Sequence, residues 1–369
     1  MEEICINLHK NVYSPGQQVT GNLEIYCQTP VKAGMLGVFI RGASDTAWFE
    51  EESRARFVRN IPRVEKVKVQ YSGEEMFVME KDVLWMGGEE GILPSGASTF
   101  PFSFTLPSNC PSSFDGANGG ISYSVNVIIG NPKVFEKDEK LLKKHFRVIS
   151  PIDTPPNQLS QPVSESVVQK KTSPFKFETI TLTVTIPRAG YTPGEIVPIT
   201  LEINNQSTGH VDLALVSLYQ TQNCLGVHPL DSAKRHIKKK HLSLAHDQKQ
   251  CFIFPRTKRT FEMYMRIPEG TPPTSMSSQI IKVMYSLVVF LNTTMIGGEC
   301  AKCVLPIVIH NAVLGSPVES EVQSSAPEVT APPPYEGNGW ISQIVPPPEY
   351  SSIVPSAPGL GEADAVVHF

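Results

Sequence analysis

The stretch YSPGQQVTGNLEI, residues 13–25, is matched further along the chain by YTPGEIVPITLEI, residues 191–203. The two stretches share a tyrosine, a Pro-Gly pair, a valine and a closing Leu-Glu-Ile at equivalent positions. A Pro-Gly pair favours a tight turn, and the alternation of apolar and polar residues after it is typical of a strand with one buried face. The repeat therefore predicts the same turn, followed by the same strand, in two parts of the chain.

Two further pairs of motifs extend the repeat in the same order. Leu106-Pro107 corresponds to Ile267-Pro268, and Tyr123-Ser124 corresponds to Tyr285-Ser286. Three matches in one order indicate a duplicated unit of about 150 residues, which is an ordinary size for a domain. We therefore expect two similar domains in tandem.

Alternation of apolar and polar residues predicts strands in the rest of the body. It is clearest in TFPFSFTLP (99–107), YSVNVII (123–129) and FETITLTVTIP (177–187). Prolines bracket many of these runs and mark strand ends or edges, because proline cannot donate to a strand ladder. The stretch EKDEKLLKKHFRV (136–148) has a helix-like charge spacing, but we interpret it as a strand with a charged approach.

Composition sets the predicted domain boundaries. With 40% apolar residues, 18% charged residues, 32 prolines and 26 glycines, the chain fits an all-β fold with many turns. We predict an N-terminal domain at 1–150, a linker rich in Pro, Ser and Gln at 151–174, a C-terminal domain at 175–312 and a tail at 313–369. The tail is proline-rich, of low hydrophobicity and free of lysine and arginine, so we predict that it is disordered.

The charges are unevenly divided between body and tail. Seven of the 36 acidic residues lie in 316–369, which leaves 29 acidic against 32 basic residues, or about +3, in the body. Such a body is compatible with an anionic partner, although ordinary scatter of charges explains the same numbers.

The basic run AKRHIKKKH (233–241) is the densest cluster of positive charge in the chain. It is a candidate site for a phosphoinositide or a phosphorylated peptide, and the alternative is a solvated hairpin face. Aromatic residues do not interleave with the basic ones, so we do not expect nucleic acid binding. The candidate anion-binding residues are Lys234, Arg235, Lys238, Lys239 and Lys240.

Three features predict a cytoplasmic protein. The N-terminal MEEICINLHK lacks the cationic and apolar regions of a signal peptide. The longest apolar run, 280–291, contains Lys282 and is too short to cross a bilayer, so it predicts a strand. The seven cysteines are odd in number and widely spread, which does not indicate a disulfide framework.

No catalytic or cofactor motif is recognisable in the sequence. It contains no glycine-rich phosphate loop, nucleophile elbow or His-Glu-x-x-His pattern, so we expect a protein that is not an enzyme and needs no cofactor. Cys300 and Cys303 have a metal or redox spacing, but a structural zinc site needs four ligands and no second Cys-x-x-Cys is present. We therefore interpret them as strand cysteines, with a metal or redox site as the alternative.

The tail carries the pattern Pro-Pro-x-Tyr twice. Proline-rich segments favour the polyproline II conformation, so they lose little conformational entropy when they dock into the aromatic-lined groove of a WW domain. The alternative is a solvating tail with incidental tyrosines. The candidate WW-binding residues are Pro333, Pro334 and Tyr335 in the first motif, and Pro347, Pro348 and Tyr350 in the second.

Two further short patterns lie beside the second motif. Pro355, Ser356, Ala357 and Pro358 resemble the Pro-Ser/Thr-Ala-Pro signal that the ESCRT sorting machinery reads. The stretch 350–353, YSSI, resembles the Tyr-x-x-apolar signal that clathrin adaptors read. Both patterns are short enough to arise by chance in a tail of this composition.

The chain as a whole resembles the alpha-arrestins, or arrestin domain-containing proteins. The segment VTIPRAGYTPGEIVPITLEINNQST (184–208) is similar to the opening of their C-terminal domain. The segment 92–129 is similar to the middle of their N-terminal domain, and the resemblance covers roughly residues 4–312. It implies two tandem immunoglobulin-like arrestin β-sandwiches joined by a short hinge and followed by the tail.

The resemblance also implies a function. In alpha-arrestins the partners of Pro-Pro-x-Tyr motifs are HECT-type ubiquitin ligases, and the arrestin body holds a transmembrane cargo protein. The implied role is a cytoplasmic adaptor that is recruited to the plasma membrane and endosomes and promotes cargo ubiquitination, endocytosis and endosomal sorting. A retromer-like sorting scaffold that works without ligases is the alternative. No counterpart of the autoinhibitory tail of visual and beta-arrestins is recognisable, so release of such a tail is not expected.

Overall fold

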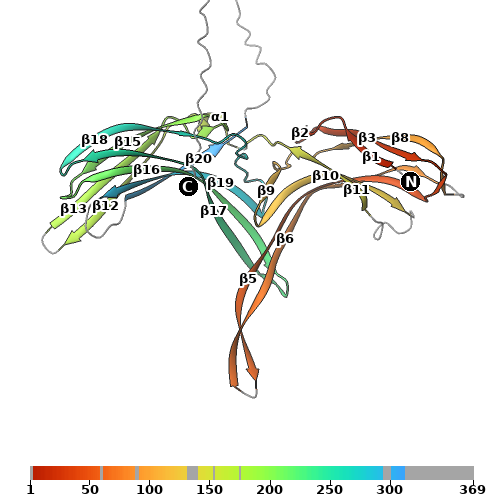
Figure 1. Ribbon diagram of the computed structural model, residues 1–369, viewed down its shortest axis with the longest axis horizontal. Helices are drawn as coiled ribbons and strands as arrows, with labels where there is room; N and C mark the ends of the chain where they lie inside the picture. Colours follow the sequence, from red (N-terminus) through yellow and green to blue (C-terminus); the bar gives the residue numbers. More distant parts are fainter. Residues whose placement is uncertain are drawn as a thin grey trace, which may run out of the picture. The chain divides into compact units, whose positions relative to one another are not determined.

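The computed structural model describes residues 3–58, 61–87, 91–130, 140–152, 154–173, 176–293 and 301–311. Within these ranges nearly every element is a strand, and the one helix is α1 (Pro156–Leu159) (Figure 1). The prediction of an all-β fold is therefore confirmed. The predicted tail, with all its motifs, and Cys300 lie outside the described residues.

The N-terminal domain is built from two sheets with a shared core. The first sheet is antiparallel and has the order β1 (Glu3–Leu8), β3 (Gln18–Cys27), β8 (Gly96–Thr105). The strands of the second sheet run in the order β6 (Ile61–Met86), β5 (Met35–Val58), β10 (Gly119–Gly130), β11 (Lys140–Val148), β2 (Val12–Tyr13). The short strands are β9 (Phe114–Gly116), which pairs with β10, and the pair β4 (Val31–Lys32) and β7 (Ile92–Leu93).

The C-terminal domain repeats this arrangement. Its first sheet has the order β12 (Val163–Ser173), β13 (Lys176–Ile186), β15 (Ile196–Asn205), β18 (Thr257–Arg266). Its second sheet has the order β14 (Gly190–Tyr191), β20 (Ala301–Ile309), β19 (Ile281–Thr293), β16 (Val211–His228), β17 (Asp231–Ile253). A single bridge between Ser72 and Val227 joins the larger sheets of the two domains.

The alternating patterns identified the buried faces of β8 and β13, but not that of β10. In β10 the prediction of one buried face is wrong, because Ser124, Asn126 and Ile128 are buried as well as Tyr123, Val125 and Val127 in this strand between β5 and β11. Ile180, Leu182, Val184 and Ile186 are each at most 1% exposed, while the threonines between them lie on the outer face of β13. The stretch 136–148, interpreted as a strand with a charged approach, contains β11. Burial of such apolar side chains is the dominant favourable contribution to folding, at about 25 cal/mol per Å² of apolar surface.

One strand lies where composition predicted a linker. β12 falls inside 151–174 and pairs with β13 along its whole length. Its outward hydroxyls bond to those of β13, with Ser164 Oγ 2.8 Å from Thr185 Oγ1 and Ser166 Oγ 3.1 Å from Thr183 Oγ1. An edge strand with serine, glutamine and lysine side chains has the composition of a linker, which is why composition alone missed it.

The repeated Pro-Gly turn is the same structure in both domains. Gly16 and Gly194 have φ of +79° and +87°, the left-handed region that glycine adopts without a steric penalty. The Gly16 amide donates to Leu106 O at 3.0 Å, and the Gly194 amide donates to Ile267 O at 3.0 Å. The motif pairs that the sequence aligned therefore meet in space, because each turn hydrogen-bonds to its own Leu-Pro or Ile-Pro partner.

The aligned tyrosines also occupy equivalent positions. Tyr123 on β10 donates its hydroxyl hydrogen bond to Pro111 O at 2.7 Å, and Tyr285 on β19 donates to Pro272 O at 2.6 Å. Both rings are buried, and burial raises the pKa of both phenols. Each tyrosine thus ties a central strand to the loop that crosses the end of its sandwich.

Candidate functional site

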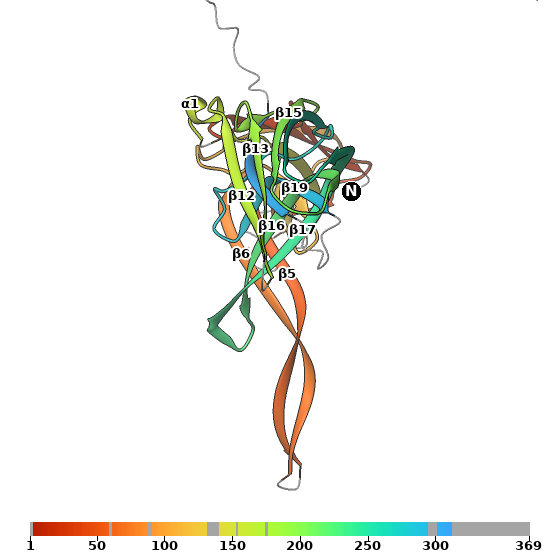
Figure 2. The ribbon, with the colours of Figure 1, turned by 90° about the vertical axis from the view of Figure 1, so that its left-hand side faces the viewer.

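Two long hairpins, one from each domain, meet beside the bridge between the sheets. The first is formed by β5 and β6, and the second by β16 and β17. Figures 1 and 2 both show the hairpins lying side by side, with the β5–β6 hairpin reaching further. β17 and the distal parts of β5 and β6 are mostly exposed, whereas β16 is buried or half-buried along its whole length.

Acidic side chains of β5 pair with basic side chains of β17. Lys234 Nζ lies 2.6 Å from Glu52 Oε1, and Lys238 Nζ lies 2.7 Å from Glu50 Oε1. His228 Nε2 is 3.6 Å from Glu52 Oε2. We name Glu50, Glu52, Lys234 and Lys238, with the rings that surround them, the hairpin clasp.

Aromatic rings form the floor of the hairpin clasp. Trp48 and Tyr71 stack with their ring centroids 6.0 Å apart, and His236 lies 5.5 Å from the Tyr71 ring. Trp48 Nε1 donates to Glu50 Oε1 at 3.1 Å, and the Tyr71 hydroxyl donates to Glu52 Oε1 at 2.7 Å. Each carboxylate is thereby held by one ring donor and one lysine, which fixes its position between the hairpins.

The hydrogen bonds shift the acidity of these groups. The hydrogen bond from Lys238 lowers the pKa of Glu50. The hydrogen bonds from Lys234 and Tyr71 lower the pKa of Glu52 to about 2. The bond to Glu52 raises the pKa of Lys234 in turn. These shifts favour the charged forms of Glu50, Glu52 and Lys234.

Strands β5 and β16 approach each other closely at Gly226, which allows Trp48 of β5 to pack on β16. A β-carbon at Gly226 would lie 2.6 Å from Trp48 Cη2 and 3.0 Å from Cζ3, closer than such atoms approach in proteins. Glycine at this position therefore provides the space that the indole ring occupies.

A second polar contact joins the domains at Glu75 on β6. Its Oε2 accepts hydrogen bonds from Ser278 Oγ at 2.7 Å and from the Gln279 amide at 2.8 Å. Ser44 Oγ on β5 lies 3.2 Å from the same oxygen. The loop before β19 is thus held to the N-terminal domain by one carboxylate.

The basic run predicted as an anion site lies on β17. Some of its residues pair with glutamates of β5, and the others do not. Lys234 and Lys238 are engaged by glutamates, so they are the least suited of the five to a second anion. Arg235, Lys239 and Lys240 have no ion pair among the described residues. Because side chains alternate along a strand, Arg235 and Lys239 lie on the face of β17 opposite the paired lysines.

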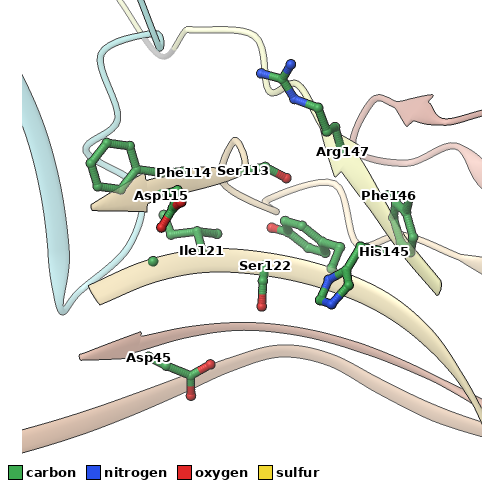
Figure 3. Close-up of a pocket in the computed structure, with 11 residues that line it drawn as sticks. Asp45, Ser113, Phe114, Asp115, Ile121, Ser122, His145, Phe146 and Arg147 are labelled. Atoms are coloured by element: carbon green, nitrogen blue, oxygen red, sulfur yellow. The ribbon is translucent and has the colours of Figure 1, made fainter. Parts of the chain in front are cut away.

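A pocket of about 590 Å³ opens on the N-terminal domain between β9 and β11 (Figure 3). Its lining brings together charges of both signs, with Asp45 and Asp115 on one side and His145 and Arg147 on β11. Arg41 bonds to Asp45, at 3.0 Å between Nη2 and Oδ1. Burial is the largest cause that lowers the pKa of His145. The lining therefore combines a largely apolar surface with charges of both signs, which favours no one class of ligand.

Of the two cysteines with a metal or redox spacing, Cys303 lies within the described residues. Cys303 on β20 is fully buried, and burial raises the pKa of its thiol to about 11, so the reactive thiolate is disfavoured. Among the described residues no group of three or more His, Cys, Asp or Glu side chains has the arrangement of a metal site.

Sequence reasoning missed the acidic half of the hairpin clasp. The run EEE at 50–52 lies in the N-terminal domain, and the basic run lies in the other domain, far away in sequence. The signal in the sequence that could have indicated this contact is the opposite charge of the two runs, one in each of the duplicated domains.

Comparison with known proteins agrees with this architecture. Residues 3–155 match the family model "Arrestin (or S-antigen), N-terminal domain", and residues 176–313 match "Arrestin (or S-antigen), C-terminal domain". The chain is 28% identical to human arrestin domain-containing protein 4 over 306 residues, which are 81% of this chain and 68% of that protein. It is 30% identical to arrestin domain-containing protein 17 of Caenorhabditis elegans over 228 residues, 59% of this chain and 51% of that protein.

The fold and the matches define an arrestin: two β-sandwiches in tandem, each with the same Pro-Gly turn. The chain belongs to the arrestin domain-containing proteins, the alpha-arrestin type of this family, which are non-catalytic adaptors. No helix in the described part of the chain is long and apolar enough to cross a membrane.

Proposed function

We propose that this protein is an adaptor that links WW-domain HECT-type ubiquitin ligases to transmembrane cargo, and so promotes cargo ubiquitination, endocytosis and endosomal sorting. One observation carries the proposal: two Pro-Pro-x-Tyr motifs follow a body that matches both arrestin domains. The arrestin body supplies a rigid surface for cargo, and the motifs supply the contact with the ligase.

The spacing of the two motifs suits a partner with several WW domains. Tyr335 and Tyr350 are 15 residues apart. A flexible chain of that length has a root-mean-square span of roughly 20 Å. Two motifs at such a distance can engage two WW modules of one ligase, and the high effective concentration of the second motif strengthens binding.

The adaptor works by proximity rather than by chemistry of its own. A ligase held by the tail is concentrated near lysines of a cargo protein that the body holds, which replaces a rare encounter with a local one. The protein itself contributes binding and orientation, in agreement with the non-catalytic character of its family.

Replacement of both motif tyrosines tests the proposal. Tyr335→Ala with Tyr350→Ala removes the two aromatic anchors, so the affinity for a purified pair of tandem WW domains, measured by calorimetry, should fall by about 100-fold or more. The matched control is Glu336→Ala with Glu349→Ala in the same tail, which should change the affinity by less than about threefold. Unchanged affinity in the tyrosine variant would overturn the ligase role and leave a ligase-independent sorting scaffold.

The free face of β17 is a second candidate contact, for an anionic membrane surface. The observation that favours it is the exposure of Arg235 and Lys239 away from the hairpin clasp. Each basic residue near an anionic leaflet contributes about 1 kcal/mol. Arg235→Glu with Lys239→Glu should therefore reduce sedimentation with phosphoinositide-containing vesicles, whereas Glu202→Gln, elsewhere on the same domain, should not.

A further inference from the structure

The second sheet of the C-terminal domain has an apolar outer face, whereas the outer face of the first sheet is polar. On the first sheet the outer positions of β13 from Thr179 to Thr185 are threonines, as expected for a face in contact with water. On the second sheet the positions between the core residues of β16, β19 and β20 are mostly apolar. We name six of these residues the outer patch: Leu213, Leu215, Tyr219, Met284, Phe290 and Val304.

The register of the ladders places these side chains next to one another. Leu215 of β16 stands opposite Phe290 of β19, and Phe290 stands opposite Lys302 of β20. Two residues back along β19, Val288 stands opposite Val304. Residues directly opposite each other lie on the same face with their β-carbons about 5 Å apart. The three strands therefore carry one continuous apolar surface.

The outer patch is packed at its centre and accessible around it. Val288 is 5% exposed although it lies on the outer face, where Phe290 and Val304 are its neighbours. Val304 is 46% exposed, and Leu215 and Tyr219 are half-buried. Clusters of accessible apolar side chains mark binding surfaces, and an apolar sheet face is normally covered by a second layer of secondary structure.

The formal charges on this face are all positive. Across positions 213–223 of β16 and the positions aligned with them on β17, β19 and β20, all of which the structure describes, the outer face carries Lys239, Lys282 and Lys302 and no carboxylate. Lys302 Nζ lies 5.4 Å from the centroid of the Phe290 ring, and Lys282 lies at the opposite end of β19. The face therefore attracts an acidic partner and repels a basic one.

The size of the outer patch fits one α-helix. β16, β19 and β20 are neighbours in the sheet (Figure 1). With strands about 4.8 Å apart they span about 10 Å, which is the diameter of a helix with its side chains. The stretch of β19 from Met284 to Phe290 is roughly 20 Å long, and a helix of about 13 residues covers that length.

We propose that the outer patch binds an amphipathic α-helix of a protein partner. The apolar stripe of the helix packs on Leu215, Phe290 and Val304, and its acidic side chains reach Lys282 and Lys302. This contact goes beyond the proposed function, because it involves neither the Pro-Pro-x-Tyr motifs nor a membrane surface. A second copy of this chain is a poor occupant, since two such faces packed against each other bring lysines toward lysines.

Model peptides test the recognition of an acidic amphipathic helix. The probe is a fluorescein-labelled peptide of about 16 residues, with leucine at helical spacing on one face and glutamate on the flanks. It is titrated with the full chain and followed by anisotropy. A scrambled peptide, which has no apolar stripe, and a peptide with lysine in place of glutamate should each bind at least tenfold more weakly. No saturable binding of the acidic peptide, or equal binding of the scrambled one, would overturn the proposal.

A matched pair of valine substitutions tests the location. Val304→Glu places a carboxylate in the outer patch and should weaken binding of the acidic peptide by at least fivefold. Val168→Glu on the outer face of β12 is the control, because Val168 is 48% exposed, against 46% for Val304. The control should change the affinity by less than twofold. Equal effects of the two variants would overturn the assignment to the second sheet.

Charge reversal gives a result that misfolding does not imitate. The variant Lys282→Glu with Lys302→Glu should bind the glutamate peptide at least tenfold more weakly than the wild type does, and the lysine peptide at least fivefold more tightly. Weaker binding of both peptides, by a variant whose circular dichroism spectrum is unchanged, would overturn the proposal.

Other occupants of the outer patch give different results. A dimer in sedimentation velocity that Val304→Glu dissociates would overturn the proposal in favour of a second copy of this chain. Sedimentation of the wild type, but not of Val304→Glu, with vesicles of neutral phosphatidylcholine would overturn it in favour of a membrane surface. The expected results are a monomer and no sedimentation with these vesicles.

Discussion

The two Pro-Gly turns and the two long hairpins are both duplicated features, but only the turns remained alike. The turns share a positive φ, at Gly16 and Gly194, and the same amide hydrogen bond of 3.0 Å. The hairpins have opposite charges where they meet, with glutamates on β5 and lysines on β17. Each turn makes its hydrogen bond within its own domain, so the same turn structure stabilises both domains. The hairpins contact each other, and attraction between them requires that they differ.

Substitution of the tyrosines at the sandwich ends should give the largest difference in unfolding free energy between the two domains. Tyr285 both donates to Pro272 O and accepts from Gln220 Nε2 at 2.7 Å, and Gln222 continues this buried chain. Tyr285→Phe leaves buried polar groups without their partner and should cost about 1–3 kcal/mol. Tyr123→Phe, which removes the bond to Pro111 O, should cost about 1 kcal/mol. Urea unfolding of both variants measures these costs, and a larger loss for Tyr123→Phe would contradict the ranking.

Substitution of the turn glycines by alanine should reduce the stability of the two domains by equal amounts. An added β-carbon at Gly16 meets no atom within 4 Å, and one at Gly194 meets Glu269 Cγ at 3.6 Å, so neither substitution creates a clash. The cost of Gly16→Ala and of Gly194→Ala is therefore conformational, about 1–2 kcal/mol each. Hydrogen exchange of β3 and β15 reports the two domains separately. Asparagine, which tolerates positive φ, should cost less than alanine at both positions, and a marked inequality between the two alanine variants would break the equivalence.

Substitution of Gly226 should loosen the contact between the hairpins. Gly226→Ala forces the Trp48 ring to move, which should cost about 1 kcal/mol and shift indole fluorescence toward longer wavelengths. The control is Trp48→Leu, which removes the ring. In that background Gly226→Ala should cost measurably less, and an undiminished cost would mean that the glycine acts through another contact.

Acidification should reduce the contribution of the hairpin clasp to stability. The pKa of Glu52 is lowered from 4.5 to about 2, so its contribution to stability is fully present above pH 4.5 and is lost as the pH falls toward 2. The stability difference between the wild type and Glu52→Gln, followed by urea unfolding, should be constant near neutral pH and shrink toward pH 2. Glu51→Gln, at a glutamate that faces Lys66 instead, serves as the control. A difference that grows on acidification would contradict the assigned pairs.

Much of the fold could be predicted from the sequence, because the decisive signals are local. Alternation along 177–187 fixed a buried face of β13, and the repeated turn fixed the correspondence of Gly16 with Gly194. Both depend on residues close together in the chain, where strand geometry translates pattern into burial directly.

The missed features depend on partners that are distant in sequence. β12 carries few apolar residues and is recognisable only through its pairing with β13. The pairs of Glu50 with Lys238 and of Glu52 with Lys234 join residues more than 180 positions apart. β17 and the distal part of the β5–β6 hairpin are mostly exposed, so a local apolar pattern does not show what they touch.

The central claim is that the arrestin body and the tail bind different partners. Proximity labelling in cells, with the labelling enzyme fused to the N-terminus, compares the wild type with the variant Tyr335→Ala, Tyr350→Ala. The account predicts that the variant loses labelled HECT-type ligases by tenfold or more but keeps the labelled membrane proteins. Retention of the ligases in the variant, or loss of membrane proteins together with them, would contradict it.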